Sequence, residues 1–451
     1  MRQIRLHDTH TGALAPLEPR DPGRVGIYAC GPTVYNRIHI GNARPFVVYS
    51  LLKRFLEHEG YAVTLVANIT DVNDKIYDAA RPLGVPSQEL ADRMAAHYRA
   101  DTDGLGLGRP DHEPLASEYV DAMVDLIGTL IERDAAYAVE GDVYFRVRSD
   151  PGYGGLSHRL IEDMDQGEGG DGLSRKEDPL DFALWKAQKP GEDTAWETPW
   201  GRGRPGWHIE CSAMAEQLLG VGFEIHGGGN DLTFPHHENE AAQTRCGRGA
   251  ELARIWMHNG MLQLGGEKMA KSVGNIALLP DVLREHGRDA VVMLFCGGHY
   301  RGPLQLDDGT LADAAARVRR VREAGRRLTD GASPAWSAAL KEEFFAALAE
   351  DFNSPRALAA VFDWVRAANS SPADAAVGGA DLHEMLDVLG LANLLEDEAG
   401  GPPEAVVALA EARVAARSAK DFAESDRLRE EIAAAGWTVR DVAAGYELVP
   451  A

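Results

Sequence analysis

Two short segments of the chain contain side chains that could act on a phosphate group. In the first, IHIGN at residues 38–42, His39 precedes Gly41 and Asn42. A glycine lets a ligand approach the backbone, the N-terminus of a following helix offers free N–H groups to phosphate, and an imidazole can donate to phosphoryl oxygens as their charge builds. By itself, the segment also fits a turn with a satisfied histidine.

The second segment is KMAKS, in which Lys268 and Lys271 are three residues apart and glycines occur at positions 265, 266 and 274. Two ammonium groups on a glycine-hinged loop can reach a pyrophosphate and neutralise its charge as it leaves. Lysines on a surface loop are usually only solvated, so this segment alone is also weak evidence. Both segments in this order, across one α/β pattern, are much less expected by chance.

A third set of residues could hold a metal ion. His236 and Glu240 are four residues apart in FPHHENE, so on a helix their side chains point the same way, and His237 with Glu240 is the competing pair. Adding Cys30 and Cys211 gives two thiolates, an imidazole and a carboxylate, all acceptable Zn²⁺ ligands. The two cysteines are far apart in the sequence and buried cysteine is commonly inert packing, so spacing alone leaves both interpretations open.

Composition excludes some classes of protein. The 451 residues have a formal net charge of −24, which disfavours a protein that coats nucleic acid indiscriminately, although a local basic patch could still meet a specific RNA. The N-terminal MRQIRLHDTHTG lacks the apolar core of a signal peptide, and no stretch of about 18 apolar residues could span a bilayer. We therefore expect a cytoplasmic protein with no membrane partner, whose four cysteines stay as thiols.

The elements that must position these residues begin with a βαβ unit. Residues 24–28 are typical of a short buried strand, residues 46–60 have apolar side chains at helical spacing and a stop at Gly60, and residues 61–70 are strand-like. The two strands are therefore expected to be parallel, with ligands beyond their carboxyl ends.

The pattern changes from about residue 110. YAVEGDVYFRV predicts a hairpin that turns at Glu140-Gly141, an antiparallel element foreign to a simple parallel sheet and therefore an insertion. The glycine-rich MDQGEGGDGLSRKED is typical of a mobile surface loop, after which the α/β pattern resumes. From about residue 305 the periodicity is helical, residues 396–406 are linker-like, and the last segment combines two helical patterns with a strand-like end.

Several loops together resemble a known family. IHIGN and KMAKS resemble the HIGH and KMSKS signatures of class I aminoacyl-tRNA synthetases, and the ordered set CGPTVY, NITDVNDK, GRPGWHIECSAM, HGGGNDL, FPHHENE and KMAKS resembles cysteinyl-tRNA synthetases from near residue 4 to the C-terminus. Asn42 replaces the second histidine of the usual motif and is a neutral donor whose charge does not change with pH, and Ala270 replaces the usual serine. We expect the enzyme to remain active despite both departures. The property that they would alter is its affinity for ATP.

The resemblance implies an α/β fold class with several domains. These are a Rossmann-like parallel-sheet catalytic domain at residues 1–304 with an inserted connective domain at about 110–200, a helical-bundle domain at 305–395, and a small C-terminal domain at 402–451. In the family, the last two domains bind the anticodon stem and the anticodon of tRNA.

The resemblance also implies zinc ligands. Cys30, Cys211, His236 and Glu240 match the family's ligand positions, whereas Cys246 and Cys296 do not match and are expected in the core. A pocket shaped for cysteine separates it from serine only about 10 to 200-fold by size, while Zn²⁺ binds and deprotonates a thiol far more readily than a hydroxyl. Zinc would therefore select the amino acid.

The remaining positions implied by the resemblance act on ATP or on the amino acid. The residues implied to act on ATP and its Mg²⁺-bound phosphates are His39, Gly41, Asn42, Gly227, Gly228, Gly229, Lys268 and Lys271. Thr70, Trp207 and Asp231 would surround the amino acid, with Asp231 countering its ammonium group. The alternative is that Trp207 is a core residue and Asp231 a helix cap.

The implied activity is a two-step acyl transfer. The cysteine carboxylate attacks the α-phosphate of ATP to give cysteinyl-adenylate and pyrophosphate, and the terminal ribose hydroxyl of tRNA(Cys) then takes the acyl group. The partners would be L-cysteine, ATP and tRNA(Cys). The protein is expected to act as a monomer. RVRRVREAGRR at residues 317–327 could present Arg317, Arg320 and Arg327 on one helix face to phosphates, or could be a solvated face.

Two other functions stay open at this point. An enzyme that joins cysteine to an amino sugar, as the mycothiol ligases do, could use the same zinc and adenylate chemistry, but the Arg-rich helical domain and the module after residue 401 would have no evident purpose there. A catalytically inactive zinc-stabilised RNA or nucleotide sensor is the second alternative, and the intact His39, Lys268 and Lys271 argue against it.

Overall fold

The computed structural model describes residues 2–164, 173–264, 267–268, 277–329, 331–372, 376–396, 403–442 and 445–450. These residues form two compact units, Met1–Leu395 and Glu396–Ala451. Ala270 and Lys271 of the predicted lysine loop, and most of the predicted glycine-rich loop and linker, lie outside the described residues. Among the helices in the described part of the chain, none combines the length and the apolar character that a membrane span requires.

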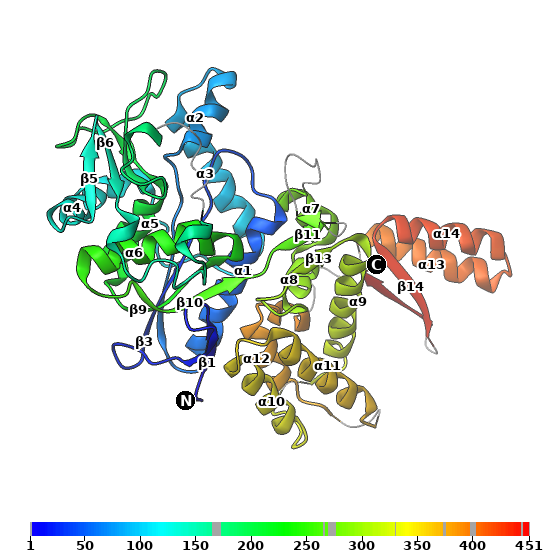
Figure 1. Ribbon diagram of the computed structural model, residues 1–451. Coiled ribbons are helices and arrows are strands. Elements are labelled where there is room, and N and C mark those ends of the chain that lie inside the picture. The colour runs from blue at the N-terminus through cyan, green and yellow to red at the C-terminus, as the bar shows by residue number, and fades with distance from the viewer. Residues whose placement is uncertain are drawn as a thin grey trace. The chain divides into compact units, whose positions relative to one another are not determined.

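A parallel four-stranded sheet organises the first unit (Figure 1). Its order is β10 (Ala253–Asn259), β9 (Phe223–Gly229), β3 (Arg24–Ala29) and β4 (Ala62–Ala67), with every neighbouring pair parallel. Because all four strands run the same way, their carboxyl ends meet at one edge, where ligands bind in open α/β sheets. The predicted parallel βαβ unit is confirmed.

Helix α1 (Ile40–His58) connects β3 to β4 and begins six residues earlier than the apolar periodicity indicated. Its first turn is closed by Asn42, whose Oδ1 accepts from the His39 N–H at 3.3 Å, a contact that periodicity does not reveal. Pro45 lies inside the helix and has no N–H for the Gly41 carbonyl. The helix ends just before Gly60, whose φ of 95° confirms the predicted stop.

An antiparallel sheet interrupts the parallel one in sequence. Its order is β5 (Ala136–Val139), β6 (Asp142–Phe145), β7 (Phe182–Ala187) and β8 (Gly203–Pro205). The predicted hairpin is confirmed: Glu140 and Gly141 join β5 to β6 with φ of 51° and 87°, the two positive angles of a type I′ turn.

The other elements of the first unit surround these sheets or form the helical segment. They are β1 (Arg5–Asp8), β2 (Ala13–Pro16), α2 (Asp74–Ala80), α3 (Ser87–Asp103), α4 (Val120–Glu132), α5 (Trp207–Leu219), α6 (Glu238–Arg248), β11 (Leu262–Leu264), β12 (Glu267–Lys268), α7 (Leu279–His286), α8 (Arg288–Cys296), β13 (Leu304–Leu306), α9 (Asp308–Gly325), α10 (Ser337–Ala349), α11 (Ser354–Ser370) and α12 (Ala380–Val388).

The helical segment confirms the predicted change of periodicity and corrects one detail. Trp364 is fully buried among these helices and its Nε1–H donates to Ser337 Oγ at 2.5 Å. Arg317 and Arg320 are exposed on α9, and the Arg320 guanidinium lies 5.4 Å from the centre of the Phe362 ring. The prediction that Arg327 shares their helix face is wrong, because α9 ends at Gly325.

The second unit packs two helices on a hairpin. Helices α13 (Glu404–Ser418) and α14 (Phe422–Ala434) precede the antiparallel strands β14 (Trp437–Val442) and β15 (Gly445–Pro450). Its small apolar core includes Ile432 and Val439. The buried Arg413 is paired with Asp441 at 2.8 Å, which offsets the cost of burying its guanidinium. The predicted two helices and strand-like end are confirmed.

Gly31 is a position at which the sheet edge tolerates only glycine. Its N–H donates to Asn68 Oδ1 at 2.9 Å, and an added Cβ would lie 1.7 Å from the Asn68 carbonyl oxygen. We expect Gly31→Ala to lower the free energy of unfolding by about 1–3 kcal/mol, the usual cost of overpacking. Gly128→Ala is the control, because nothing lies within 4 Å of an added Cβ on that helical residue.

The measurement is urea unfolding followed by circular dichroism. Gly128→Ala should match or exceed the wild-type midpoint, since alanine is the better helix former by about 1 kcal/mol. A Gly31→Ala variant as stable as the wild-type protein would contradict the proposed clash.

Candidate active site

A cavity of ≈ 340 Å³ opens at the carboxyl edge of the parallel sheet. Cys30 follows β3, Gly229 ends β9, and Asn259 ends β10, so three strands deliver residues to its wall. The predicted site residues that line this cavity are Cys30, His39, Gly41, Asn42, Trp207, Gly229 and Asp231. Segments far apart in the sequence therefore converge on one space.

The start of α1 forms one wall of the cavity. The Ile40 N–H donates to Ala277 O at 2.9 Å, and the Leu279 N–H donates to Ile38 O at 3.1 Å. These bonds hold the IHIGN segment against the residues that follow the predicted lysine loop. Lys268 pairs with Gln263 in the β11–β12 ladder, which fixes the backbone at the beginning of that loop.

The three glycines that end β9 are required for two different reasons: close packing at Gly227 and Gly228, and the cavity wall at Gly229. An added Cβ at Gly227 would lie 2.0 Å from the Tyr49 hydroxyl, which donates to Met257 O at 2.6 Å, so this glycine makes room for α1. An added Cβ at Gly228 would lie 3.1 Å from His237 Cε1. Of the three glycines, Gly229 is the one that lines the cavity.

Thr70 lies behind the cavity rather than on its wall. It is buried, its carbonyl accepts from the Val34 N–H at 3.1 Å, and its hydroxyl donates to Glu210 Oε2 at 3.0 Å. Burial, together with the nearby Cys211, raises the pKa of Glu210 well above its usual value. Sequence reasoning missed Glu210, although it lies inside the quoted GRPGWHIECSAM motif.

Four buried side chains meet beside the cavity. The Cys30 and Cys211 sulfurs are 3.7 Å apart, Cys30 Sγ is 3.7 Å from Glu240 Oε1, and His236 Nε2 is 3.0 Å from the same oxygen. One donor atom from each of the four lies within 4.8 Å of all the others. The structure thus brings together the four residues predicted as metal ligands.

A second donor set overlaps the first. It shares Cys30 and Glu240 but replaces Cys211 and His236 by His226 and His237. His237 Nε2 is 3.3 Å from Cys30 Sγ, while its Nδ1 lies 2.7 Å from His258 Nε2. The sequence analysis kept His237 with Glu240 as the competing pair. It missed His226, although His226 is the first residue of the HGGGNDL motif.

The electrostatics distinguish the histidines. Burial would lower the pKa of His236, but Glu240 and Cys211 outweigh it and raise the pKa to about 10. Burial lowers the pKa of His237 well below its usual value and that of His258 to about 3, so both are neutral. Of these three histidines, His236 is therefore the one whose protonated form its neighbours favour.

The two thiols differ as well. The pKa of Cys211 falls to about 6, chiefly through its contact with Cys30, whereas burial raises the pKa of Cys30 well above its usual value. Burial would raise the pKa of Glu240, but His226 and His236 hold it well below its usual value. The metal-free centre thus holds a thiolate and a carboxylate around a protonated His236.

This donor set fits Zn²⁺. Two sulfurs that are each about 2.3 Å from one tetrahedral ion would be about 3.8 Å apart, close to the observed separation of Cys30 and Cys211. His236 Nδ1 lies 3.0 Å from His208 Nδ1, and burial lowers the pKa of His208, so the neutral His208 can orient the His236 ring. The Trp207 ring stacks on His236 with centres 4.2 Å apart.

Comparison with known proteins decides the family. Residues 16–316 match the model of the tRNA synthetases class I (C) catalytic domain, residues 343–393 the DALR domain, and residues 399–446 the cysteinyl-tRNA ligase anticodon binding domain. The chain is 45% identical to a cysteine–tRNA ligase of Halorhodospira halophila, with 98% of each chain covered. It is 44% identical to that of Symbiobacterium thermophilum, again over 98% of each.

The chain belongs to the cysteinyl-tRNA synthetase family. It is a class I ligase, which confirms the resemblance stated from its motifs.

Solved structures of class I synthetases share the fold of this family member. A methionyl-tRNA synthetase of Mycobacterium tuberculosis in complex with methionyl-adenylate has a TM-score of 0.59 and 17% identity, covering 82% of this chain and 90% of that chain. A LeuRS of Agrobacterium radiobacter K84, in a ternary complex with tRNA, has a TM-score of 0.63 and 12% identity, covering 84% and 85%. The predicted Rossmann-like fold class is confirmed.

Zinc binding is expected to release about two protons per chain at pH 7, because ligands must be deprotonated to bind a metal. In the metal-free protein Cys30 and His236 carry protons at that pH, since both pKa values are raised, whereas Cys211 and Glu240 are largely ionised. Zinc affinity should therefore fall as the pH falls.

Titration calorimetry of chelator-treated protein, in two buffers of different ionisation enthalpy, counts these protons. Cys296→Ser is the control: it removes another fully buried thiol of raised pKa and should leave the proton count unchanged. Cys211→Ser should bind zinc much more weakly. No proton release, or equal binding by both variants, would contradict the assignment.

Proposed function

We propose that this chain attaches L-cysteine to tRNA(Cys) through a cysteinyl-adenylate, and that it selects cysteine by its sulfur at a zinc ion. The ion would be held by Cys30, Cys211, His236 and Glu240. The observation that carries the proposal is the convergence of these donors within 4.8 Å, with Cys30 on the wall of the cavity that also contains His39 and Asn42.

Selection has to rest on chemistry because cysteine and serine are nearly isosteric. Size and apolar contact separate such pairs only about 10 to 200-fold. When bound, Zn²⁺ supplies a Lewis acid that prefers a thiolate to a hydroxyl. The chain contributes the low-pKa Cys211 and Glu240, which present negative charge to the cation in a site closed to water.

The other residues proposed to bind the amino acid lie on the cavity wall or directly behind it. Asp231 would counter the ammonium group of cysteine, and Trp207 would hold the His236 ring by stacking. Thr70 would act from behind the wall, because its hydroxyl and carbonyl hold Glu210 and the Val34 backbone. These side chains orient the substrate so that its carboxylate faces the nucleotide.

The first step would be stabilised by charge rather than by a covalent enzyme nucleophile. His39, Lys268 and Lys271 would neutralise the phosphates of Mg²⁺–ATP, with Gly41 and Gly229 allowing the nucleotide to approach the backbone and Gly227 and Gly228 supporting the strand behind it. Asn42 would contribute a neutral hydrogen bond. Its contact with the His39 N–H keeps the first turn of α1 closed.

The second step needs a tRNA held at a distance from the cavity. We propose residues 1–304 as the catalytic domain with its insertion at about 110–200, residues 305–395 as the anticodon-stem domain, and residues 402–451 as the anticodon domain. The DALR and anticodon-binding matches support the last two assignments. Arg317 and Arg320 are two exposed cations of α9 that would contact phosphates. One chain contains every residue of the proposal, so a monomer suffices.

The test is an assay of both steps. Zinc-loaded protein should catalyse cysteine-dependent ATP–pyrophosphate exchange and charge tRNA, and should prefer cysteine over serine by more than the ~200-fold upper limit that size alone allows. Cys30→Ser should lose that preference. Cys246→Ser, which changes a half-buried thiol outside both donor sets, should keep it. Exchange without tRNA charging would favour a small acceptor instead, and absence of exchange would overturn the proposal.

Lys271→Ala tests the proposed role of the lysine loop. Removing one ammonium group should slow adenylate formation by about 10²–10³-fold, the usual loss when a donor to developing charge is removed. Cysteine binding should change little, since the zinc ligands are intact. Pyrophosphate exchange measures the rate and calorimetry measures cysteine binding, with Lys189→Ala as the control. Equal exchange rates for Lys271→Ala and the wild-type protein would refute the role.

A further inference from the structure

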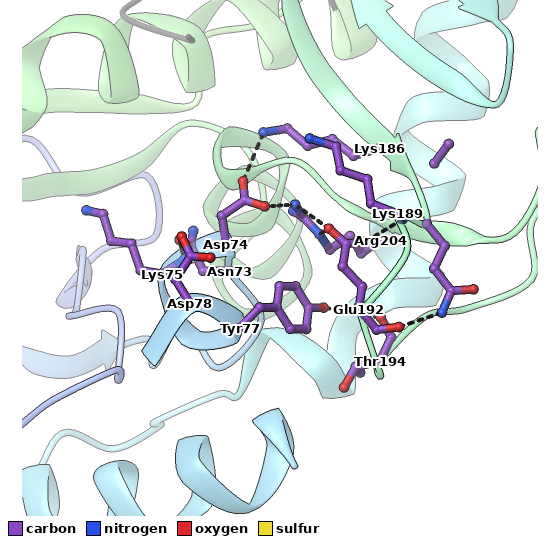
Figure 2. Close-up of polar contacts among 12 residues, drawn as sticks. Asn73, Asp74, Lys75, Tyr77, Asp78, Lys186, Lys189, Glu192, Thr194 and Arg204 are labelled. Carbon is purple, nitrogen blue, oxygen red and sulfur yellow. Dashed lines mark hydrogen bonds and ion pairs between the residues drawn. The ribbon is translucent and has the colours of Figure 1, made fainter. Parts of the chain in front are cut away.

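A buried arginine ties the inserted sheet to helix α2. Arg204 of β8 has a side chain only 3% exposed, and its guanidinium pairs with Asp74 at the start of α2 and with Glu192 at 3.2 Å. Lys186 of β7 lies 3.4 Å from the other Asp74 oxygen. Figure 2 shows these side chains converging from α2 and from the inserted sheet. Together they fix the orientation of Asp74.

A second contact holds α2 along its length. The Tyr77 hydroxyl donates to Thr194 O at 3.2 Å, and the Arg204 guanidinium lies 5.5 Å from the centre of the Tyr77 ring. Asp74 and Tyr77 are three residues apart and so lie on one face of the helix, the face turned to the insertion. The rotation of α2 about its axis is therefore set.

That rotation directs Lys75 toward the cavity. Consecutive helical residues point about 100° apart, so a helix that turns Asp74 to the insertion turns Lys75 away from it, as Figure 2 shows. Lys75 lines the cavity, and its ammonium lies 5.8 Å from the centre of the Tyr35 ring, which lines it too.

Lys75 supplies unneutralised positive charge to this wall. Arg37, the other Lys or Arg side chain among the described residues of the wall, is paired with Asp101 of α3. In the described part of the chain, Lys75 has no carboxylate partner, and its side chain is exposed. Proteins that bind single-stranded nucleic acid combine cationic side chains, which contact the backbone, with aromatic side chains, on which bases stack, and Lys75 beside Tyr35 offers one of each.

The position of Lys75 separates it from the segment expected to bind the ATP phosphates. Lys75 approaches Tyr35, and Tyr35 follows Val34, whose N–H donates to the Thr70 carbonyl. Because Thr70 is one of the residues proposed around the amino acid, Lys75 lies on the proposed amino-acid side of the cavity. His39 instead pairs with Leu278, just after the predicted lysine loop. A phosphate at Lys75 would therefore lie apart from the His39 segment that is expected to contact ATP.

We propose that Lys75 binds a phosphodiester of the single-stranded 3′ end of tRNA and that the Arg204–Asp74 pair holds it in position to do so. This inference rests on the proposed function, because it names the residue that guides the acceptor to the adenylate. The shared ligand chemistry is a phosphate oxyanion, which ATP also offers.

The experiment compares Lys75→Gln, Lys75→Arg and the control Arg81→Gln, which removes an exposed cation next to α2 that does not line the cavity. Charging of tRNA gives kcat/KM for tRNA, single-turnover transfer from preformed adenylate gives the second step, and cysteine-dependent pyrophosphate exchange gives KM for ATP. We expect Lys75→Gln to lower kcat/KM for tRNA about 10-fold while KM for ATP stays within 2-fold.

The salt dependence adds a readout that a merely structural role would not move. Loss of one phosphate contact to a single strand should reduce the slope of log(kcat/KM) against log[salt] by about 0.7. Lys75→Arg should restore both values because it keeps the charge, and Arg81→Gln should behave as the wild-type protein.

Other outcomes separate the two sources of phosphate. A raised KM for ATP with unchanged transfer would assign the Lys75 contact to ATP and overturn the inference. Wild-type charging kinetics and salt slope in Lys75→Gln would also overturn it, while leaving the proposed function intact. A wild-type protein that forms no cysteinyl-tRNA would overturn both.

Discussion

The burial of charge beside the sheet edge is the constraint on which the rest of the site depends. Cys211, His236 and Glu240 are almost completely removed from water. Isolated buried charges cost several kcal/mol each, so such a cluster is tolerated only when opposite charges and hydrogen bonds surround it. Neutral His208 and the Trp207 ring hold His236 in place, and a cation matched to the cluster would replace its protons. The centre is thus prepared for a positive ligand before substrate arrives.

The order of the strands in the parallel sheet explains why the four buried donors lie next to the IHIGN segment. Strand β9 pairs with β3, and the Cys30 N–H donates to Gly227 O at 2.9 Å, so the end of β3 is fixed against the glycine tract. The chain then passes directly from Cys30 to the IHIGN segment and α1. One short loop therefore separates Cys30 from the residues proposed to contact ATP. In the proposed function, the selection of cysteine and its activation by ATP would therefore use one wall of the cavity, because Cys30 and the IHIGN segment both follow β3.

Local signals made part of this arrangement predictable from the sequence. Apolar periodicity predicts the βαβ unit, and the strand-like runs on either side of Glu140-Gly141, with a glycine suited to positive φ at 141, predict the hairpin. The start of α1 at Ile40 was not predictable from periodicity, because its first turn is closed by the Asn42 side chain rather than by an apolar face. The Arg204–Asp74 pair was missed for another reason: it joins two ordinary charged residues 130 positions apart, and only the folded insertion brings them together.

In the proposed function, the neutral Asn42 would change how charge is distributed around ATP. An asparagine can hold the first turn of α1 but adds no positive charge when phosphate charge builds in the transition state. Arg37 is paired with Asp101, and Lys75, which approaches the Tyr35 ring, is assigned to the tRNA acceptor rather than to ATP, so neither would replace the missing charge in the proposed function. In the proposed function, neutralisation in the first step would then depend on His39, Lys268 and Lys271. The β11–β12 ladder and the hydrogen bond from the Ile40 N–H to Ala277 O hold the described residues on either side of the predicted lysine loop, beside β11 and the start of α1.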